Sequence, residues 1–180
     1  MIKYQLTNTN KELEEIIVLQ QKNLPVNIST NEITEQGFVS AQHTLALLKK
    51  MHDAHPHVIA KENGKVVGYA LCMLQEFRNE IPLLTPMFNQ TDTAINELNE
   101  PINYMVMGQV CIDKDYRKLG IFRALYNFMK ENISKEYNAI ITEVDVKNIR
   151  SVNAHKAIGF EVLKEHISNN QNWELIILRT

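Results

Sequence analysis

Residues 103–160 constrain the fold of this chain more than any other stretch, because an apolar run, a basic turn and an amphipathic segment follow one another without a break. Residues 104–112 have the length and the composition of a β-strand. From residue 121 onward, apolar side chains recur every three or four positions, which predicts a helix with one buried face. The apolar positions of this helix are Ile121, Leu125, Phe128, Met129 and Ile133. We therefore predict a strand, a turn and a helix in direct succession.

The turn between this strand and this helix has the properties of an anion-binding site. Arg117 and Lys118 carry positive charge just before Gly120. The predicted helix has no serine, threonine or aspartate cap at its start, so the N–H groups of its first turn lack a side-chain acceptor and the helix dipole favours an anion there. A strand, a basic glycine-containing turn and an uncapped helix start together predict a phosphate-binding site over residues 117–122.

A second strand and a short helix follow this segment. Residues 139–146 begin fully apolar and then alternate, which predicts a strand that leaves the core toward a polar edge. Either Asn148 or Ser151 can cap a short helix that continues through His155. Gly159 ends this helix, because a residue just past a helix end often needs a positive φ. A further strand is predicted to begin after it.

The phosphate-binding turn resembles the pyrophosphate loop of the GNAT superfamily of acyl-CoA-dependent N-acetyltransferases, which reads Arg/Gln-x-x-Gly-x-Gly/Ala after a strand. Arg117 and Gly120 match this pattern, whereas Phe122 stands where the family has a small residue. A small residue there normally lets the backbone approach a phosphate closely. The ring of Phe122 must therefore turn into the core behind the loop, or the loop must shift.

The segment after it resembles the next block of the same family, Asn-x-x-Ala/Ser-x-x-x-Tyr-x-x-x-Gly-Phe. The residues that match this block are Asn148, Ser151, Gly159 and Phe160. His155 stands where the family usually has tyrosine. Either block alone is a weak signal, but their order and their separation by one helix and one strand make the combination specific. The resemblance is sharpest over residues 107–160 and covers nearly the whole chain in its order of elements.

The resemblance implies an α/β (α+β) GNAT fold, with a central, mostly antiparallel mixed sheet flanked by helices and with splayed fourth and fifth strands. It implies an enzyme that moves the acetyl group of acetyl-CoA to a primary amine of a small molecule or peptide by direct attack, without a metal, and homodimers are common in the family. The pantetheine arm of coenzyme A would bond to strand backbone at Val110, Cys111 and Ile112. The other residues implied to contact coenzyme A are Arg117, Lys118, Leu119, Gly120, Ile121, Phe122, Asn148 and Ser151.

Acetyl transfer needs a base or a proton relay for the amine, and a proton donor helps the thiolate to leave. Glu143 is the candidate base and shares a strand face with Asp145, although carboxylates at a strand end are more often solvated or structural. Gln109 can orient an amine but cannot accept its proton. His155 occupies the family's donor position, where it either donates a proton in its charged form, a minority state at neutral pH, or only packs.

The alternative function is a GNAT-like module that binds acyl-CoA as a sensor or scaffold without efficient turnover. Two departures from the family pattern keep it open, namely Phe122 in the phosphate-binding turn and His155 in place of tyrosine. Release of the coenzyme A thiol in the presence of a panel of amines would separate an enzyme from such a module.

The N-terminal part is predicted to follow the family's order, with a strand, two helices and a hairpin. Pro25 ends the first helix, and residues 26–37 are expected to form an irregular loop that faces the substrate. Ser40 is the expected cap of the second helix. The dipeptide Asn63-Gly64 predicts a hairpin between two strands.

The C-terminal part begins with a long connection, residues 75–102, in which Pro82, Pro86 and Pro101 break any extended helix. The connection is too apolar for a solvated linker and is expected to help build the acceptor pocket. Its acidic residues hint weakly at a cationic acceptor; they are Glu76, Glu80, Asp92, Glu97 and Glu100. Two closing strands are predicted over residues 160–164 and 173–179.

Composition limits the remaining possibilities. A chain of 180 residues fits one domain, residues 1–180, with a sizeable core. A net charge of −2 argues against a dedicated nucleic-acid binder but not against a phosphorylated co-substrate. Cys72 and Cys111 lie in apolar runs and are expected to be reduced, which favours a cytoplasmic protein. No segment has the length and apolarity of a membrane span, and the histidines around Pro56 lack the ligands of a zinc site.

Overall fold

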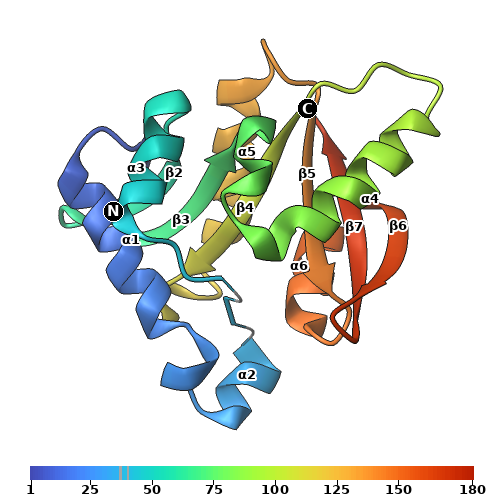
Figure 1. The fold of residues 1–180 in the computed structure, drawn as a ribbon. Coiled ribbons are helices and arrows are strands. Elements are labelled where there is room, and N and C mark those ends of the chain that lie inside the picture. The colour runs from blue at the N-terminus through green and yellow to red at the C-terminus, as the bar shows by residue number, and fades with distance from the viewer. Residues whose placement is uncertain (37, 40) are drawn as a thin grey trace.

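One mixed sheet of seven strands organises residues 1–36, 38–39 and 41–180, which are the residues that the computed structural model describes (Figure 1). The strands are β1 (Lys3–Leu6), β2 (Val58–Glu62), β3 (Lys65–Met73), β4 (Tyr104–Ile112), β5 (Ala139–Asp145), β6 (Glu161–Ser168) and β7 (Gln171–Arg179). Their order in the sheet is β1-β2-β3-β4-β5-β7-β6, and only the β4–β5 pair is parallel. The predicted mostly antiparallel mixed sheet is confirmed.

Helices cover both faces of this sheet. They are α1 (Asn10–Lys22), α2 (Thr30–Gln36), α3 (Leu45–Ala54), α4 (Thr85–Asn96), α5 (Ile121–Ile133) and α6 (Ile149–Ala157). Residues of α1, α3 and α4 belong to one buried cluster, and residues of α5 and α6 belong to a second. Alternate residues of β5 enter the two clusters, Ile141 the first and Ile140 the second, so the clusters lie on opposite faces. Helix α4 lies over β6 and β7 (Figure 1).

The segment predicted as an irregular loop, residues 26–37, is instead mostly helical as far as it is described. It contains a 3₁₀ turn at Pro25–Asn27 and the helix α2. The Ser29 hydroxyl accepts a hydrogen bond from the Glu32 N–H at 3.3 Å, and the Glu32 carboxylate accepts one from the Ser29 N–H at 3.1 Å. The sequence pattern Ser-x-x-Glu is typical of such a reciprocal capping box.

Helix α3 begins later than predicted. Its cap is Thr44, whose hydroxyl accepts a hydrogen bond from the Leu47 N–H at 3.2 Å. The predicted cap, Ser40, lies outside the described residues. Thr44 is a residue of the same capping class, so the helix was predicted correctly and its boundary was not.

The long connection 75–102 is more ordered than predicted. It holds 3₁₀ turns at Gln75–Asn79 and Pro82–Leu84 and the twelve-residue helix α4. Pro86 lies in the first turn of α4 and does not break it. The first N–H groups of a helix have no intrahelical acceptor, so a proline there removes no helical hydrogen bond.

Both tight hairpins use residues with positive φ. Asn63 and Gly64 have φ of 50° and 80° between β2 and β3, which confirms the predicted hairpin. Asn169 and Asn170 have φ of 50° and 59° between β6 and β7. These two strands extend closer to the turn than the sequence predicted.

Strands β4 and β5 diverge after a short parallel pairing. Tyr104–Val106 pairs with Ala139–Ile141, and within the described residues the pairing goes no further. Of the remaining β4 residues, 107 and 110–112 stay paired with β3 on their other side, and a register shift opposite Ala70 and Cys72 separates them. The predicted splay is therefore confirmed, and it leaves one edge of β4 without a strand partner.

In the described part of the chain, no helix has the length and apolarity needed to cross a membrane. Within the same residues, no three histidine, cysteine, aspartate or glutamate side chains come together as a metal site would require. Cys72 and Cys111 are both buried and form no disulfide.

Candidate active site

A cavity of about 270 Å³ lies at the splay between β4 and β5. It brings together every residue predicted to contact coenzyme A except Leu119, whose side chain is 62% exposed. The predicted residues that line it are Val110, Cys111, Ile112, Arg117, Lys118, Gly120, Ile121, Phe122, Asn148 and Ser151. Tyr116, Arg150 and Ala154 also line it, and sequence reasoning did not single them out.

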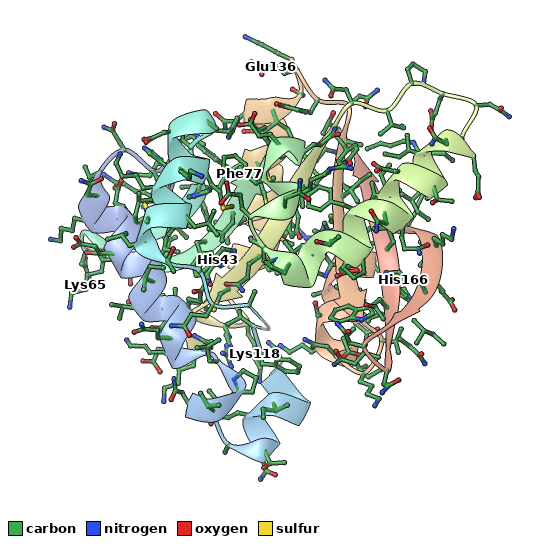
Figure 2. All side chains as sticks on the ribbon, viewed as in Figure 1. His43, Lys65, Phe77, Lys118, Glu136 and His166 are labelled. Atoms are coloured by element: carbon green, nitrogen blue, oxygen red, sulfur yellow. The ribbon has the colours of Figure 1, made fainter. Side chains whose placement is uncertain are left out.

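The turn before α5 is shaped to receive an anion. Gly120 is the N-cap residue of α5 with φ of 78°, and no side chain caps this helix, as predicted. A Cβ atom built on Gly120 would meet no atom within 4 Å, so the helix start faces open space. Lys118, which is labelled in Figure 2, also adopts a left-handed backbone, with φ of 65°. Unpaired N–H groups, a helix dipole and a lysine therefore converge on one end of the cavity.

Arg117 anchors this turn to the rest of the fold. Its Nη2 donates to the Asn23 side-chain oxygen at 2.7 Å, and its Nε donates to the Ile112 carbonyl at 3.3 Å. Asn23 in turn accepts the N–H of Val39 on its own carbonyl at 3.2 Å. The side chain of Arg117 thus links α1, β4 and the turn. Asn23 was not predicted, because the contact spans most of the chain and leaves no local pattern.

The ring of Phe122 turns into the core behind the loop, which is the first of the two alternatives that the sequence left open. Its ring centroid lies 5.1 Å from that of Tyr126 and 5.0 Å from that of His155. The ring packs against the core on the α5 side of the sheet rather than standing in front of the helix start. The aromatic residue therefore fits the turn without moving it.

His155 is buried, with 1% of its surface exposed, and both of its ring nitrogens are engaged. Nδ1 lies 2.8 Å from the Ser151 carbonyl, which can only accept, so Nδ1 carries the proton. Nε2 lies 2.8 Å from the Tyr126 hydroxyl, which then donates to it. Burial lowers the pKa of His155 to about 4, so the ring is neutral at pH 7. This geometry favours the packing role over the proton-donor role.

We expect His155→Phe to cost about 1–3 kcal/mol in the free energy of unfolding, because the buried Tyr126 hydroxyl and the Ser151 carbonyl lose their partner. Urea denaturation measures this loss. Tyr126→Phe is the matched control, since it removes the same hydrogen bond from the other side. If the protein is the enzyme that the resemblance implies, the dependence of its rate on pH should keep its shape in His155→Phe. A fall of the rate at high pH that is present in the wild type and absent from His155→Phe would show instead that His155 protonates the leaving thiolate.

A second cavity, of about 110 Å³, adjoins the first and is lined by residues 107–110 of β4 and 142–145 of β5. The residues that line both cavities are Phe38, Val39, Val110, Asn148 and Ser151. Asn148 caps α6 by accepting the Ser151 N–H at 3.2 Å, so it shapes the wall common to the two cavities. The second cavity is closed by Met87 of α4 and by residues 142–145 of β5.

Glu143 faces this second cavity and has an unusual protonation equilibrium. Burial raises the pKa of its carboxyl to about 7. His166 of β6, which is labelled in Figure 2, lies beside it, with Nε2 3.1 Å from the carboxylate oxygen Oε2 according to the hydrogen-bond geometry. Burial, followed by the charge of Lys164, lowers the pKa of His166, so the neutral ring donates to the carboxylate. The sequence indicated Glu143 but not His166, because cross-strand pairing brings the two together.

The neighbouring Asp145 is a structural residue. It lines the same cavity, as its shared strand face with Glu143 predicts. Its two carboxylate oxygens accept from the Lys147 N–H at 2.9 Å and from the Gln171 side-chain amide at 3.2 Å. Asp145 therefore stabilises the turn after β5, and Glu143 is the candidate for a chemical role in this cavity.

Gln109 is held in a buried polar network. Its Oε1 accepts from the Gln20 amide at 2.8 Å and from the Tyr69 hydroxyl at 2.5 Å, and its Nε2 donates to the Ala41 carbonyl at 2.8 Å. Gln20 also bonds to the His43 ring and to the His43 N–H, both at 2.7 Å. These bonds tie α1, β3 and β4 to the segment that leads into α3. Gln109 thus supports a cavity wall, and the expectation that it orients an amine finds no support in its hydrogen bonds.

The chain belongs to the acetyltransferase (GNAT) family, whose model matches residues 27–160. No match was found among curated proteins. Solved structures with this fold include the ribosomal-protein-S18-alanine N-acetyltransferase from Escherichia coli, at 11% identity and a TM-score of 0.65, with 99% of this chain and 94% of that chain covered.

Two further solved structures share the fold. The NatC complex bound to Gag peptide and CoA contains a chain at 16% identity and a TM-score of 0.68, with 99% of this chain and 98% of that chain covered. The protein yncA from Salmonella typhimurium, solved with its cofactor acetyl-CoA, has 13% identity and a TM-score of 0.65, with 99% of this chain and 94% of that chain covered. At these identities the likeness shows the fold, which the family match places among the GNAT acetyltransferases.

Proposed function

We propose that this protein transfers the acetyl group of acetyl-CoA to a primary amine of a small molecule or peptide by direct attack. The observation that carries this proposal is the pair of adjoining cavities at the β4–β5 splay, with an anion-binding turn in one and the carboxylate of Glu143 in the other. The solved relatives support it, because yncA was solved with acetyl-CoA and the NatC complex with CoA and a peptide.

The first cavity fits coenzyme A in two of its chemical features. The uncapped start of α5 and the open space in front of Gly120 suit a pyrophosphate. The edge of β4 over residues 107–112, which has no partner on the β5 side, offers backbone groups that the amides of a pantetheine arm can pair with. We assign Val110, Cys111 and Ile112 to the arm and residues 117–122 to the pyrophosphate.

The second cavity fits the acceptor amine. In the transfer, the amine nitrogen forms a bond to the acetyl carbon, the bond from that carbon to sulfur breaks, and coenzyme A leaves as its thiolate. The nitrogen of an acceptor that arrives as an ammonium group loses two protons, one before it attacks and one as the carbon–sulfur bond breaks. We assign the first proton to Glu143, and the second goes to water. A carboxyl pKa of about 7 makes Glu143 a stronger base than an ordinary glutamate, while leaving it largely ionised slightly above neutral pH.

The protons on the coenzyme A sulfur and on His166 need no further catalytic residue. A thiol pKa of roughly 8.5 lets coenzyme A leave as an anion and take its proton from water. His166 keeps its own proton, and its hydrogen bond holds the carboxylate of Glu143 in place. His155 is assigned to packing.

Release of the coenzyme A thiol, followed with a thiol reagent against a mixed panel of amines, tests this function. Turnover that depends on both acetyl-CoA and an amine is the expected result. Calorimetric titration with coenzyme A is run in parallel. Tight binding without turnover against any amine would instead identify a non-catalytic acyl-CoA-binding module.

A further inference from the structure

We propose that the acceptor is a primary amine with one positive charge and an apolar group close to the nitrogen, rather than a polyamine or another polycation. This inference rests on the proposed function and adds the chemical class of the acceptor. It follows from the wall, the charge and the size of the second cavity.

The wall of the second cavity combines a large apolar surface with polar side chains, which outside β5 are those of Gln109, Asn148, Ser151 and His155. Met87 of α4 and Leu84 of the preceding 3₁₀ turn form one side, and Met107 of β4 and Trp173 of β7 contribute further apolar surface. An apolar substituent gains free energy on leaving water for such a wall. A second ammonium group would lose its hydration there, and the polar side chains of Gln109, Asn148 and His155 already hydrogen-bond within the protein.

The charge on the cavity matches one cation. Among the described residues, its lining contains no lysine or arginine and two carboxylates, Glu143 and Asp145. Both oxygens of Asp145 already accept hydrogen bonds from Lys147 and Gln171. Asp145 is thus fixed through both of its oxygens, whereas Glu143 accepts a bond from His166 on one oxygen, so we assign the incoming ammonium group to Glu143.

The acidic residues of the connection 75–102 do not enlarge this charge. None of them lines either splay cavity. Asp92 pairs with Arg78 at 2.8 Å, Glu80 pairs with Lys50 at 2.7 Å, and Glu100 pairs with Arg179 at 2.5 Å. The weak indication of a cationic acceptor that the sequence drew from these residues therefore receives no support from their positions.

The size of the cavity points the same way. Its volume of about 110 Å³ is small beside the roughly 300–1,000 Å³ of sites that enclose a whole ligand. It admits an amine and a group of side-chain size. The remainder of a larger acceptor, such as a peptide that begins with a large apolar residue, must extend outside.

The apolar wall also serves the chemistry. Loss of hydration lowers the pKa of an ammonium group and raises that of a carboxyl group. An acceptor that seals the cavity with an apolar group therefore brings the two pKa values closer and eases proton transfer to Glu143. A hydrated polycation would keep water in the cavity and lose this advantage.

The test compares isopentylamine with putrescine, two primary amines that have the same number of non-hydrogen atoms and differ in a second ammonium group. Initial rates of thiol release at saturating acetyl-CoA give kcat/KM for each amine. We expect isopentylamine to be favoured at least about tenfold. A preference for putrescine would overturn the inference and leave the proposed function intact.

Leu84→Glu and Leu84→Gln form a matched pair of variants at a partly exposed position of the wall. The glutamate offers a partner to a second ammonium group, so the preference for isopentylamine should fall at least about threefold in Leu84→Glu relative to Leu84→Gln. Equal preferences in the two variants would show that this wall does not contact the acceptor. The glutamine variant controls for lost apolar area and for effects on folding.

Tripeptides that begin with leucine or with lysine separate the two sources of such an amine. A higher kcat/KM for the leucine peptide than for isopentylamine identifies a peptide N-terminus as the acceptor. A higher kcat/KM for isopentylamine identifies a free amine. Both outcomes are consistent with the inference. A preference for the lysine peptide contradicts it. No turnover with any amine, despite coenzyme A binding, would overturn the proposed function and this inference together.

Discussion

Gly120→Asp is expected to weaken acetyl-CoA binding by more than about tenfold, because it places a negative charge at the helix start that the pyrophosphate would occupy. Isothermal titration of the wild-type protein and the variant measures the change in Kd. The free energy of unfolding should fall by about 1–2 kcal/mol, the cost of a non-glycine residue at φ of 78°. The side chain itself should add little to this cost, since it meets open space and the helix dipole of α5 favours a carboxylate at that end. The expected signature is a loss of affinity beyond that of a neutral variant with the same loss of stability.

Gly120→Asn is the matched control for the left-handed backbone. Gly120 has φ of 78°, a conformation in which asparagine and aspartate are the least unfavourable replacements. The two variants therefore share the same backbone cost and nearly the same shape, and they differ in charge. Equal affinities of the aspartate and asparagine variants would remove the pyrophosphate from this turn. A loss of stability that both variants share would be due to the left-handed backbone and not to the charge.

The sequence predicted the fold well because its signals are local. The apolar run 104–112, the period of the α5 side chains and the dipeptide Asn63-Gly64 each describe a few consecutive residues, and each led to the right element. The splay was implied by family resemblance alone. Backbone groups that lack a partner leave no trace in side-chain composition.

The errors arose where local signals competed. Three prolines outweighed the helical tendency of residues 85–96, although a proline in the first turn of a helix costs little. The polar composition of residues 26–37 hid a capping box at Ser29. One of these segments, residues 85–96, lines the second cavity through Met87, and the other ends just before the lining residue Phe38. The sequence prediction was therefore weakest near this cavity.

The residues of the site likewise fall into those that a local motif predicts and those that it does not. Residues of the anion-binding turn follow one another in sequence, and a motif could find them. The partners that set the properties of the site come from distant segments; examples are Asn23 against Arg117, Tyr126 against His155 and His166 against Glu143. Only tertiary structure shows that His155 is bonded through both nitrogens or that Glu143 is buried beside an imidazole.

Glu143→Gln is expected to lower kcat/KM for the amine by about 10²–10⁴-fold, the usual contribution of a positioned base, with no change in Kd for acetyl-CoA. The glutamine keeps the shape of the side chain and can still accept a hydrogen bond from His166, so folding should be unaffected. Titration with acetyl-CoA and thermal denaturation serve as controls. A decrease of only a few-fold would mean that water or another group removes the proton.

The pH dependence tests the same assignment more sharply. The ionised form of Glu143 is the active one, and burial raises its pKa to about 7, so the wild-type rate should rise with pH through about 7 and then level off. In Glu143→Gln this limb should vanish, and the rate should instead keep rising toward the pKa of the free amine. His166→Leu should move the wild-type limb to higher pH, because the carboxylate loses a hydrogen bond that stabilises its charged form. An unmoved limb in His166→Leu would show that burial alone sets the pKa of Glu143, whereas a limb that persists in Glu143→Gln would assign it to a different group.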